Sequence, residues 1–244
     1  MMEPLVNWPG LHSLVNCVIP ARMGSKRLPG KVLAKVNGIP LLAYAVETAR
    51  LSGVFAGVWV STESPEIAEV AERWGAAVID RPPDLASDTA RLKQVIAHAV
   101  GAMDSWSAAG PKPYVAVVLP TALLLHPDDL KGMWGKLQVG GKGVMAVVRP
   151  AEHPLYSLVE KDGCLVPYTG DFDPPRTQDL PELWVDAGYA YIYDKADFLA
   201  HGFYGEHLLG YPLPRYRVVD IDTPEDLGAA EALYERWKKM GFEA

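Results

Sequence analysis

The stretch IPARMGSKRLPGKVL, residues 19–33, gathers basic side chains in a protein that is acidic overall. Its four cations fall close together and are Arg22, Lys26, Arg27 and Lys31. The chain has a formal net charge of -7, yet no Asp or Glu occurs from position 4 to position 46. Gly24 and Gly30 let the backbone approach a ligand closely or adopt a positive φ. Backbone N–H groups beside unpaired cations suit a phosphate chain, so we predict that this loop binds phosphate.

A solvated basic turn is the general alternative to a phosphate-binding loop. The missing acidic counter-charges favour a ligand, and so does the position of the loop between a predicted strand and a predicted helix. Ligands of open α/β sheets bind at that edge. The loop matches neither G-x-G-x-x-G nor G-x-x-x-x-G-K-[ST], which weakens the dinucleotide-fold and P-loop interpretations.

A pair of carboxylates near the end of the chain is the second candidate site. In the stretch VVDIDTPEDL, Asp220 and Asp222 would point to one face of a predicted strand, about 6–7 Å apart. Adjacent carboxylates repel each other unless a cation lies between them or one is protonated, so the pair predicts a divalent metal site. Two solvated acids at the end of a strand are the alternative.

The residues that follow this pair have a structural explanation. Thr223 is expected to cap the last helix and Pro224 to take its first position. Glu225 and Asp226 would then complement the helix dipole, which removes them from the candidate site.

A cationic loop and a two-carboxylate metal site together indicate chemistry on a nucleoside triphosphate. Mg²⁺ would bridge phosphate oxygens while lysines take up charge on the departing pyrophosphate. Nucleotidyl transfer explains both features more simply than hydride transfer or hydrolysis does.

Alternating strands and helices must position these residues. Apolar, β-branched runs predict strands at 15–21, 57–62, 76–82, 114–122, 143–150, 184–194 and 216–222. Amphipathic segments predict helices at 40–53, from Ser64 onward, 88–103, 127–137 and 224–240. Continuous apolar strands separated by helices predict an α/β fold, a three-layer, doubly wound and mostly parallel sheet.

The pattern changes between residues 151 and 183. A hairpin turning at Asp162–Gly163 is followed by a Pro-rich polar stretch without periodicity. We interpret 151–183 as an inserted arm with a small β element, which a second subunit would cover. The α/β domain would then comprise 15–150 and 184–244, after a loose N-terminal extension at 1–14.

Composition excludes several classes of protein. No apolar run is long enough to cross a bilayer, and the first residues lack the features of a secretory signal. Cys17 and Cys164 have no metal-ligand spacing, so free thiols and a cytoplasmic location are expected. The acidic balance argues against nucleic acid and membrane surfaces as partners.

Four motifs resemble those of bacterial sugar-acid cytidylyltransferases. The basic loop is similar to their R-x-G-S-K-x-x-P-x-K-N signature, and RPPDLASDT (81–89) is similar to R-P-x-x-L-A-x-D. RTQDLPELWVDAG (176–188) and PRYRVVDIDTPEDL (214–227) resemble R-x-Q-D-L-P and D-I-D-T-x-x-D of the acylneuraminate branch. The motifs follow the family's order and extend over nearly the whole chain.

The resemblance implies a nucleotidyltransferase-like fold, a homodimer that exchanges arms, and Mg²⁺-dependent transfer of CMP from CTP to a nine-carbon sugar acid, with release of pyrophosphate. The implied nucleotide-binding residues are Arg22, Gly24, Ser25, Lys26, Lys31 and Arg81, of which Arg22 and Lys31 would act in catalysis. The implied sugar-acid residues are Arg176, Gln178 and Asp179, and the implied metal ligands are Asp220 and Asp222. Rim residues of an exposed arm are the alternative for Arg176, Gln178 and Asp179.

Two departures bear on the substrate. Val32 stands where the signature ends in Asn, and LPTALLL (119–125) replaces the Q-P-T-S-P-L-R of the sialate enzymes. The DAG of 186–188 and the final motif look most like pseudaminic acid cytidylyltransferases, so pseudaminic or legionaminic acid is the expected substrate. An octulosonate-type or other sugar cytidylyltransferase, a non-catalytic nucleotide-binding homologue and a glycosyltransferase with Asp220 and Asp222 as metal ligands remain alternatives.

Overall fold

A seven-stranded sheet forms the centre of the computed structural model, which describes residues 14–106, 110–171, 173 and 175–241. The extension expected at 1–14 lies, except for Leu14, outside the described residues. The strands are β1 (Val15–Pro20), β4 (Gly57–Thr62), β5 (Ala77–Asp80), β6 (Tyr114–Val118), β7 (Gly143–Val148), β10 (Val185–Asp194) and β11 (Leu208–Pro212). Their order across the sheet is β11-β7-β10-β6-β1-β4-β5.

The sheet is mostly parallel, as predicted. β1 pairs in parallel with β4 and β6, β4 with β5, and β11 with β7. β10 is antiparallel to both of its neighbours, β6 and β7, so it alone in this sheet runs the other way. The carboxyl ends of the parallel strands and the first residues of β10 therefore meet at one edge.

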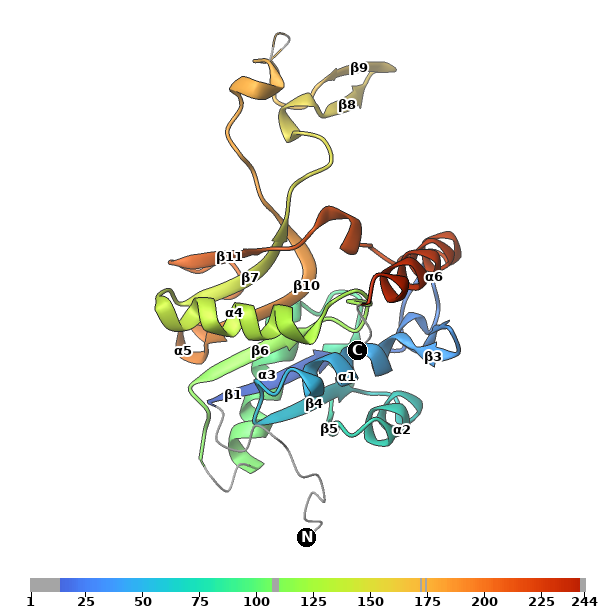
Figure 1. The fold of residues 1–244 in the computed structure, drawn as a ribbon, viewed down its shortest axis with the longest axis vertical. Helices are drawn as coiled ribbons and strands as arrows, with labels where there is room; N and C mark the ends of the chain where they lie inside the picture. The colour runs from blue at the N-terminus through green and yellow to red at the C-terminus, as the bar shows by residue number, and fades with distance from the viewer. Residues whose placement is uncertain (1–13, 107–109, 172, 174, 242–244) are drawn as a thin grey trace.

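Helices cover both faces and give the three layers that the sequence predicts (Figure 1). The helices are α1 (Leu41–Leu51), α2 (Pro65–Arg73), α3 (Leu92–Trp106), α4 (Pro127–Val139), α5 (Lys195–His201) and α6 (Pro224–Lys239). Buried residues of α1, α2 and α4 pack in one core with β1 and β4, whereas those of α3 and α5 pack on the other face. α6 contributes to a third cluster with Leu41 and Tyr44 of α1.

Two helix starts behave as their sequences predict. The Ser64 side chain accepts a hydrogen bond from Ile67 N, with Pro65 in the first turn of α2. The Thr223 hydroxyl accepts from Asp226 N, and the Asp226 carboxylate accepts from Thr223 N, which is a capping box at the start of α6.

The expected hairpin is formed by β8 (Leu158–Lys161) and β9 (Cys164–Pro167), which pair only with each other. Asp162 and Gly163 turn the chain with φ values of 53° and 77°. Figure 1 shows this hairpin standing away from the body, joined to it through the ends of β7 and β10. All four residues of β8 are exposed.

The strand predicted at 216–222 is wrong. Residues Arg215–Arg217 form a 3₁₀ turn, and 218–222 adopt no regular structure. Side chains take the backbone groups that a neighbouring strand would have paired: the Tyr189 hydroxyl bonds Val219 N, and the Asp226 carboxylate bonds Asp222 N.

Smaller differences are found elsewhere. α3 begins at Leu92 and not at 88, and Pro83–Ala86 forms a separate 3₁₀ turn before it. The strand β11, the helix α5 and the short hairpin of β2 (Lys35–Val36) and β3 (Ile39–Pro40) are not predicted from the sequence. No described helix is both long and apolar enough to span a bilayer.

Candidate functional site

The basic loop leaves the carboxyl end of β1, as predicted. It returns through a 3₁₀ turn at Lys31–Leu33, and Gly30 enters that turn with φ of 66°, a value that favours glycine. At Gly24 a Cβ would lie 3.8 Å from the Arg22 Nη1 atom, which is an ordinary contact. Backbone conformation therefore explains Gly30, whereas packing within the chain does not require glycine at position 24.

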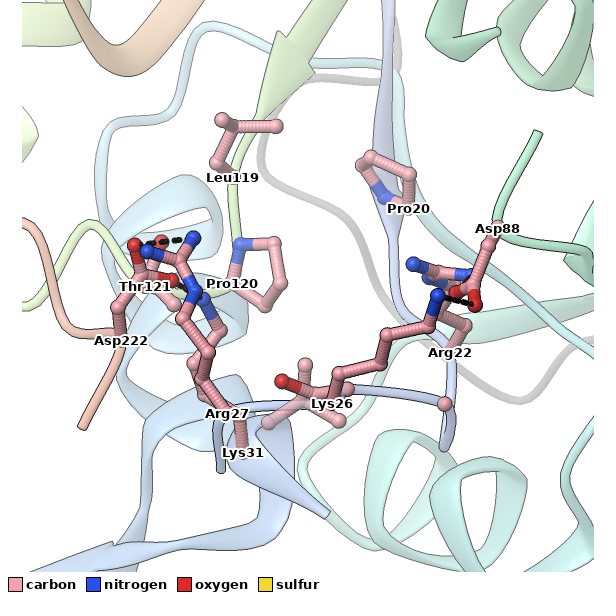
Figure 2. Close-up of a pocket in the computed structure, with 13 residues that line it drawn as sticks. Pro20, Arg22, Lys26, Arg27, Lys31, Asp88, Leu119, Pro120, Thr121 and Asp222 are labelled. Atoms are coloured by element: carbon pink, nitrogen blue, oxygen red, sulfur yellow. Dashed lines mark hydrogen bonds and ion pairs between the residues drawn. The ribbon is translucent and has the colours of Figure 1, made fainter. Parts of the chain in front are cut away.

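A cavity of about 490 Å³, here called the loop cavity, lies against this loop (Figure 2). Its walls are Pro20, Arg22, Gly24, Ser25, Lys26, Arg27, Lys31, Val32, Asp88, Leu119, Pro120, Thr121 and Asp222. Most of these residues follow β1, β5 or β6, because the ends of parallel strands meet at this edge. The fold thus brings the early cationic loop and the late Asp222 into one site.

Two aspartates distant in sequence pair with the cations of the loop. Arg22 Nη1 and Lys26 Nζ lie 3.0 and 2.9 Å from the Asp88 carboxylate. Arg27 Nη2 and Lys31 Nζ lie 2.6 and 2.9 Å from the Asp222 carboxylate. Figure 2 shows these two groups on opposite sides of the cavity. The loop lacks acidic partners only in its own stretch of sequence, since the fold supplies them from two other segments.

The two aspartates of the late motif influence each other although they lie outside any strand. Burial raises the pKa of Asp220 and the nearby Asp222 charge raises it further. The pKa of Asp222 is lowered, first by the hydrogen bond that Lys31 donates to it. The two carboxylates therefore affect each other's pKa as expected, whereas the strand geometry that predicted their alignment is absent from 218–222.

Buried polar contacts fix the segment that carries this pair. The Tyr189 hydroxyl donates to Arg217 O at 2.8 Å and accepts from Val219 N at 2.9 Å. Burial raises the pKa of Tyr189 to about 12, so the hydroxyl keeps the proton that it donates. The Arg217 guanidinium bonds Leu124 O and pairs with the buried Asp129 carboxylate, which joins the segment to the start of α4.

Arg81 lines a smaller cavity of about 230 Å³ that shares Pro20, Arg22 and Leu119 with the loop cavity. Only 4% of the residue is exposed. Its Nε donates to Ser61 Oγ at 3.2 Å, and its Nη2 donates to Ser61 O. Burial lowers the pKa of Arg81. The predicted nucleoside-side arginine is thus next to the site, with its guanidinium largely engaged by β4.

A third cavity, of about 530 Å³, continues from the loop cavity and is here called the second cavity. The two share Lys31, Leu119 and Thr121. The ionisable residues of its walls are Lys31, Asp186, Arg215 and Asp220. Both oxygens of the Asp186 carboxylate accept from the Tyr191 hydroxyl, at 2.9 and 2.8 Å.

The predicted sugar-acid residues lie on the arm and line none of these three cavities. Arg176 Nε pairs with the Asp179 carboxylate at 2.8 Å, and both side chains are exposed. Gln178 is exposed as well. Within one chain, the structure does not bring Arg176, Gln178 or Asp179 to the cavities.

Several residues of the site were missed from the sequence. Asp88 lies inside the quoted motif RPPDLASDT, so the sequence shows how many residues separate it from Arg81. Its ion pair with Arg22 of the loop cannot be read from the sequence. Thr121 belongs to LPTALLL (119–125), which stands out in the sequence only by its differences from the motif of the sialate enzymes. Asp186 and Arg215 also lie within quoted motifs, yet only the bend of the chain before and after them shows that they face one cavity.

The doubly wound sheet, with the cation-lined cavity at its carboxyl edge, is an α/β fold of the kind found in nucleotidyltransferases. Two solved structures share this fold. A CMP:2-keto-3-deoxy-manno-octonic acid synthetase complexed with CTP matches with a TM-score of 0.65 at 17% identity, covering 91% of this chain and 98% of that one. A 4-diphosphocytidyl-2C-methyl-D-erythritol synthase from Anaerococcus prevotii matches with a TM-score of 0.65 at 14% identity, covering 92% and 99%.

The chain belongs to the cytidylyltransferase family. The family model described as cytidylyltransferase matches residues 16–105. A pseudaminic acid cytidylyltransferase of Campylobacter jejuni is 32% identical over 223 residues, which cover 90% of this chain and 95% of that protein. An N-acylneuraminate cytidylyltransferase of Oncorhynchus mykiss is 31% identical over 94% of this chain and 52% of its own length. A CMP-N,N'-diacetyllegionaminic acid synthase of Legionella pneumophila is 30% identical, over 89% and 95%. The resemblance seen in the four motifs is confirmed.

Proposed function

We propose that this protein transfers CMP from CTP to a nonulosonic acid of the pseudaminic or legionaminic type and releases pyrophosphate. The observation that carries the proposal is the shared cavity of the cationic loop and Asp222, which are joined by the Lys31–Asp222 pair at 2.9 Å. The names of two relatives similar over nearly their whole length support this choice of acids.

In this proposal the triphosphate lies in the loop cavity. Arg22, Gly24, Ser25, Lys26 and Lys31 surround it with cations, a hydroxyl and backbone N–H groups. The nucleoside lies toward the smaller cavity beside Arg81. Phosphate oxygens would replace Asp88 and Asp222 as partners of the cations, because the triphosphate carries more negative charge than either carboxylate.

The reaction is an in-line displacement at the α-phosphorus. The anomeric hydroxyl of the acid forms the new O–P bond, the bond to the β-phosphate oxygen breaks, and the hydroxyl proton passes to solvent or a base. Arg22 and Lys31 act by stabilising negative charge on the phosphoryl oxygens and the departing pyrophosphate, where fixed cations lower the barrier most.

Asp220 and Asp222 are suited to Mg²⁺. Both are oxygen ligands, and the effect of each carboxylate on the pKa of the other supports the proposal that they act on one ion. Among the described residues, no group of three or more His, Cys, Asp or Glu side chains could hold a metal. An ion held by Asp220 and Asp222 would therefore need substrate phosphates as further ligands. When bound, Mg²⁺ would supply Lewis-acid stabilisation of phosphate charge.

A homodimer and a cytoplasmic location complete the proposal. The β8–β9 hairpin exposes Leu158, Val159 and Leu165, and two strands alone bury too little apolar surface to be stable. A partner that covers this hairpin would also explain how Arg176, Gln178 and Asp179 on one arm could reach the acid in the site of another copy. The exposed free thiol of Cys164 is consistent with a reducing compartment.

The direct test is pyrophosphate release by the purified protein with CTP and Mg²⁺, across pseudaminic, legionaminic, N-acetylneuraminic and octulosonic acids. We expect turnover with one of the first two. Asp222→Ala should lower kcat about 100-fold or more, because it removes a metal ligand and the partner of Lys31. Asp128→Ala, at the exposed start of α4, is the matched control and should retain activity. No pyrophosphate from any acid would refute the proposal.

Val32 favours one second candidate, a nucleotide-binding homologue that no longer catalyses. Its apolar side chain lines the loop cavity where the family signature carries Asn, so one amide is missing from the nucleotide site. This alternative is distinguished by a CTP-dependent rise in Tm without pyrophosphate from any of the four acids.

A further inference from the structure

In the part of the chain that the structure describes, Arg215 is the basic wall residue of the second cavity without an ion pair. Of its basic wall residues, Lys31 is paired with Asp222 and also lines the loop cavity. Arg215 is the other. Its guanidinium makes one long contact, 3.4 Å from Nη1 to Val218 O, and among the described residues no carboxylate is within ion-pair distance of it. Arg215 is exposed and belongs to the short turn just before the Asp220 segment.

Neighbouring arginines are already engaged. Arg149 follows β7 between Val148 and Pro150, two wall residues of the second cavity, but its guanidinium pairs with Glu182 at 2.8 Å and lies 4.5 Å from the centre of the Trp184 ring. Arg217 is buried and holds Asp129. Arg215 is therefore the arginine of this region that is available for an anion entering the cavity.

The chemistry of a 2-keto sugar acid makes such a cation important. In its ring form, the carboxylate and the attacking anomeric hydroxyl are bonded to the same carbon. A group that holds the carboxylate therefore also fixes the hydroxyl relative to the α-phosphate. Arginine is suited to this because its planar fork binds both carboxylate oxygens.

The second cavity has the position that this geometry needs. It shares the Lys31 wall with the loop cavity, so an acid bound there adjoins the proposed triphosphate site. Its other ionisable residues besides Lys31 are the acidic Asp186 and Asp220, which would repel the carboxylate. An acid entering with its carboxylate toward Arg215 avoids that repulsion and leaves hydroxyl or amide hydrogens to face Asp186.

We propose that Arg215 binds the carboxylate of the acceptor sugar acid and thereby positions its anomeric hydroxyl for attack. This inference rests on the proposed function and adds a specificity-determining residue to it. It differs from the expectation that Arg176 on the arm is the arginine on the sugar side.

Steady-state kinetics of Arg215→Met and Arg215→Lys provide the test, with Arg149→Met as the matched control. The probe is whichever of pseudaminic and legionaminic acid the unaltered protein turns over more efficiently. For Arg215→Met we expect KM for the acid to rise at least about 10-fold while KM for CTP changes less than about twofold. Arg215→Lys should recover part of this loss, and Arg149→Met should resemble the unaltered protein.

The methyl ester of the same acid separates a carboxylate contact from a general loss of function. The unaltered protein should prefer the acid to the ester by at least about 10-fold, and Arg215→Met should lose most of that preference. An unchanged KM for the acid, or equal losses with acid and ester, would overturn the assignment to Arg215. Equal effects of Arg149→Met would overturn it too, because they would indicate only a general need for positive charge.

Binding without turnover keeps this inference distinct from the proposed function. Calorimetry would measure acid and ester binding in the presence of CTP carrying a methylene bridge between the α- and β-phosphorus atoms. If the unaltered protein releases no pyrophosphate but Arg215→Met still abolishes the preference for acid over ester, the proposed function fails and the role of Arg215 stands. If pyrophosphate is released and the preference does not depend on Arg215, the proposed function stands and the role of Arg215 fails.

Discussion

At the scale of single residues, two aspartates and the proposed triphosphate would compete for the same four cations of the loop. Asp88 and Asp222 each hold two basic side chains of the loop, so the site is pre-formed before any phosphate arrives. A triphosphate that displaces them would gain fixed cations whose positions cost little further ordering. The same exchange would free Asp222 to bind a metal beside Asp220.

The two late aspartates should titrate in a definite order. Burial and the Asp222 charge raise the pKa of Asp220 above 3.8, whereas Lys31 holds the pKa of Asp222 below 3.8. As pH falls, Asp220 is therefore protonated first, and the proposed Mg²⁺ affinity should fall with it. The ion pair of Asp222 with Lys31 contributes stability above pH 3.8 and loses it only as pH falls through the lowered pKa.

Carboxyl ¹³C chemical shifts followed against pH would measure this order. Asp222→Asn is the informative variant. It removes the negative charge that raises the pKa of Asp220 and leaves the charges of Lys31 and Arg27, which lower it. The pKa of Asp220 should move downward in that variant. A pKa of Asp220 that lies below that of Asp222, or that rises in Asp222→Asn, would contradict the electrostatic account.

At the scale of elements, a helix cap is connected to the candidate metal segment. The Asp226 carboxylate accepts hydrogen bonds from Asp222 N, Thr223 N and the Thr223 hydroxyl. These bonds lower the pKa of Asp226, with the Asp222 N–H first among the causes. The start of α6 and the position of Asp222 are thus set by one group of contacts.

Thr223→Ala should reduce both stability and turnover. Loss of an N-cap hydroxyl costs about 1 kcal/mol, which lowers Tm by about 2–4 °C in a protein of this size. Because the same contacts place Asp222, the Mg²⁺ concentration needed for half-maximal pyrophosphate release should rise as well. Ser64→Ala removes the comparable cap of α2, away from Asp222, and should lower Tm without changing the Mg²⁺ requirement. A normal Mg²⁺ requirement in Thr223→Ala would show that the helix cap does not determine the position of Asp222.

The elements also show how far sequence reasoning reaches. Apolar periodicity predicts β1, β4 and α2 because each buries a continuous face and α2 begins at a recognisable cap. It misses β11, since LLGYP is short and only half-buried and its pairing with β7 depends on distant sequence. The 216–222 segment has the composition of a strand, but tertiary contacts from Tyr189 decide its conformation.

The site divides along the same line. The cationic loop could be predicted, because charge clustering is a local property of a sequence. The Asp220 and Asp222 pair could be singled out by its spacing, but the strand that was to align the two side chains does not form. The partners of the cations could not be predicted. Asp88 follows β5 and Arg215 follows β11, so their places in the cavities depend on the order of strands in the sheet, which no local pattern contains.

At the scale of the whole molecule, the hairpin is the feature that one chain leaves incomplete. Leu165 is 68% exposed on β9 opposite Glu160, so it shares a face of the hairpin with the exposed Leu158, whereas the exposed Val159 lies on the other face. Figure 1 shows the hairpin projecting from the body of the molecule, with α1 to α6 lying away from it. Apolar side chains gathered on a projecting pair of strands are typical of a surface that binds another copy.

Leu165→Glu should therefore convert the proposed homodimer into monomers. In a symmetric interface each substitution acts twice, and loss of two buried leucines at about 2 kcal/mol each weakens association on the order of 1000-fold. Sedimentation velocity across a range of protein concentrations would measure it. Val139→Glu is the matched control, because Val139 is 91% exposed at the end of α4, away from the arm, and should leave the assembly unchanged.

A Leu165→Glu protein that sediments like the unaltered one would exclude this face of the hairpin from the interface. If monomers form and KM for the sugar acid rises while KM for CTP does not, the arm also contributes to the acceptor site of its partner.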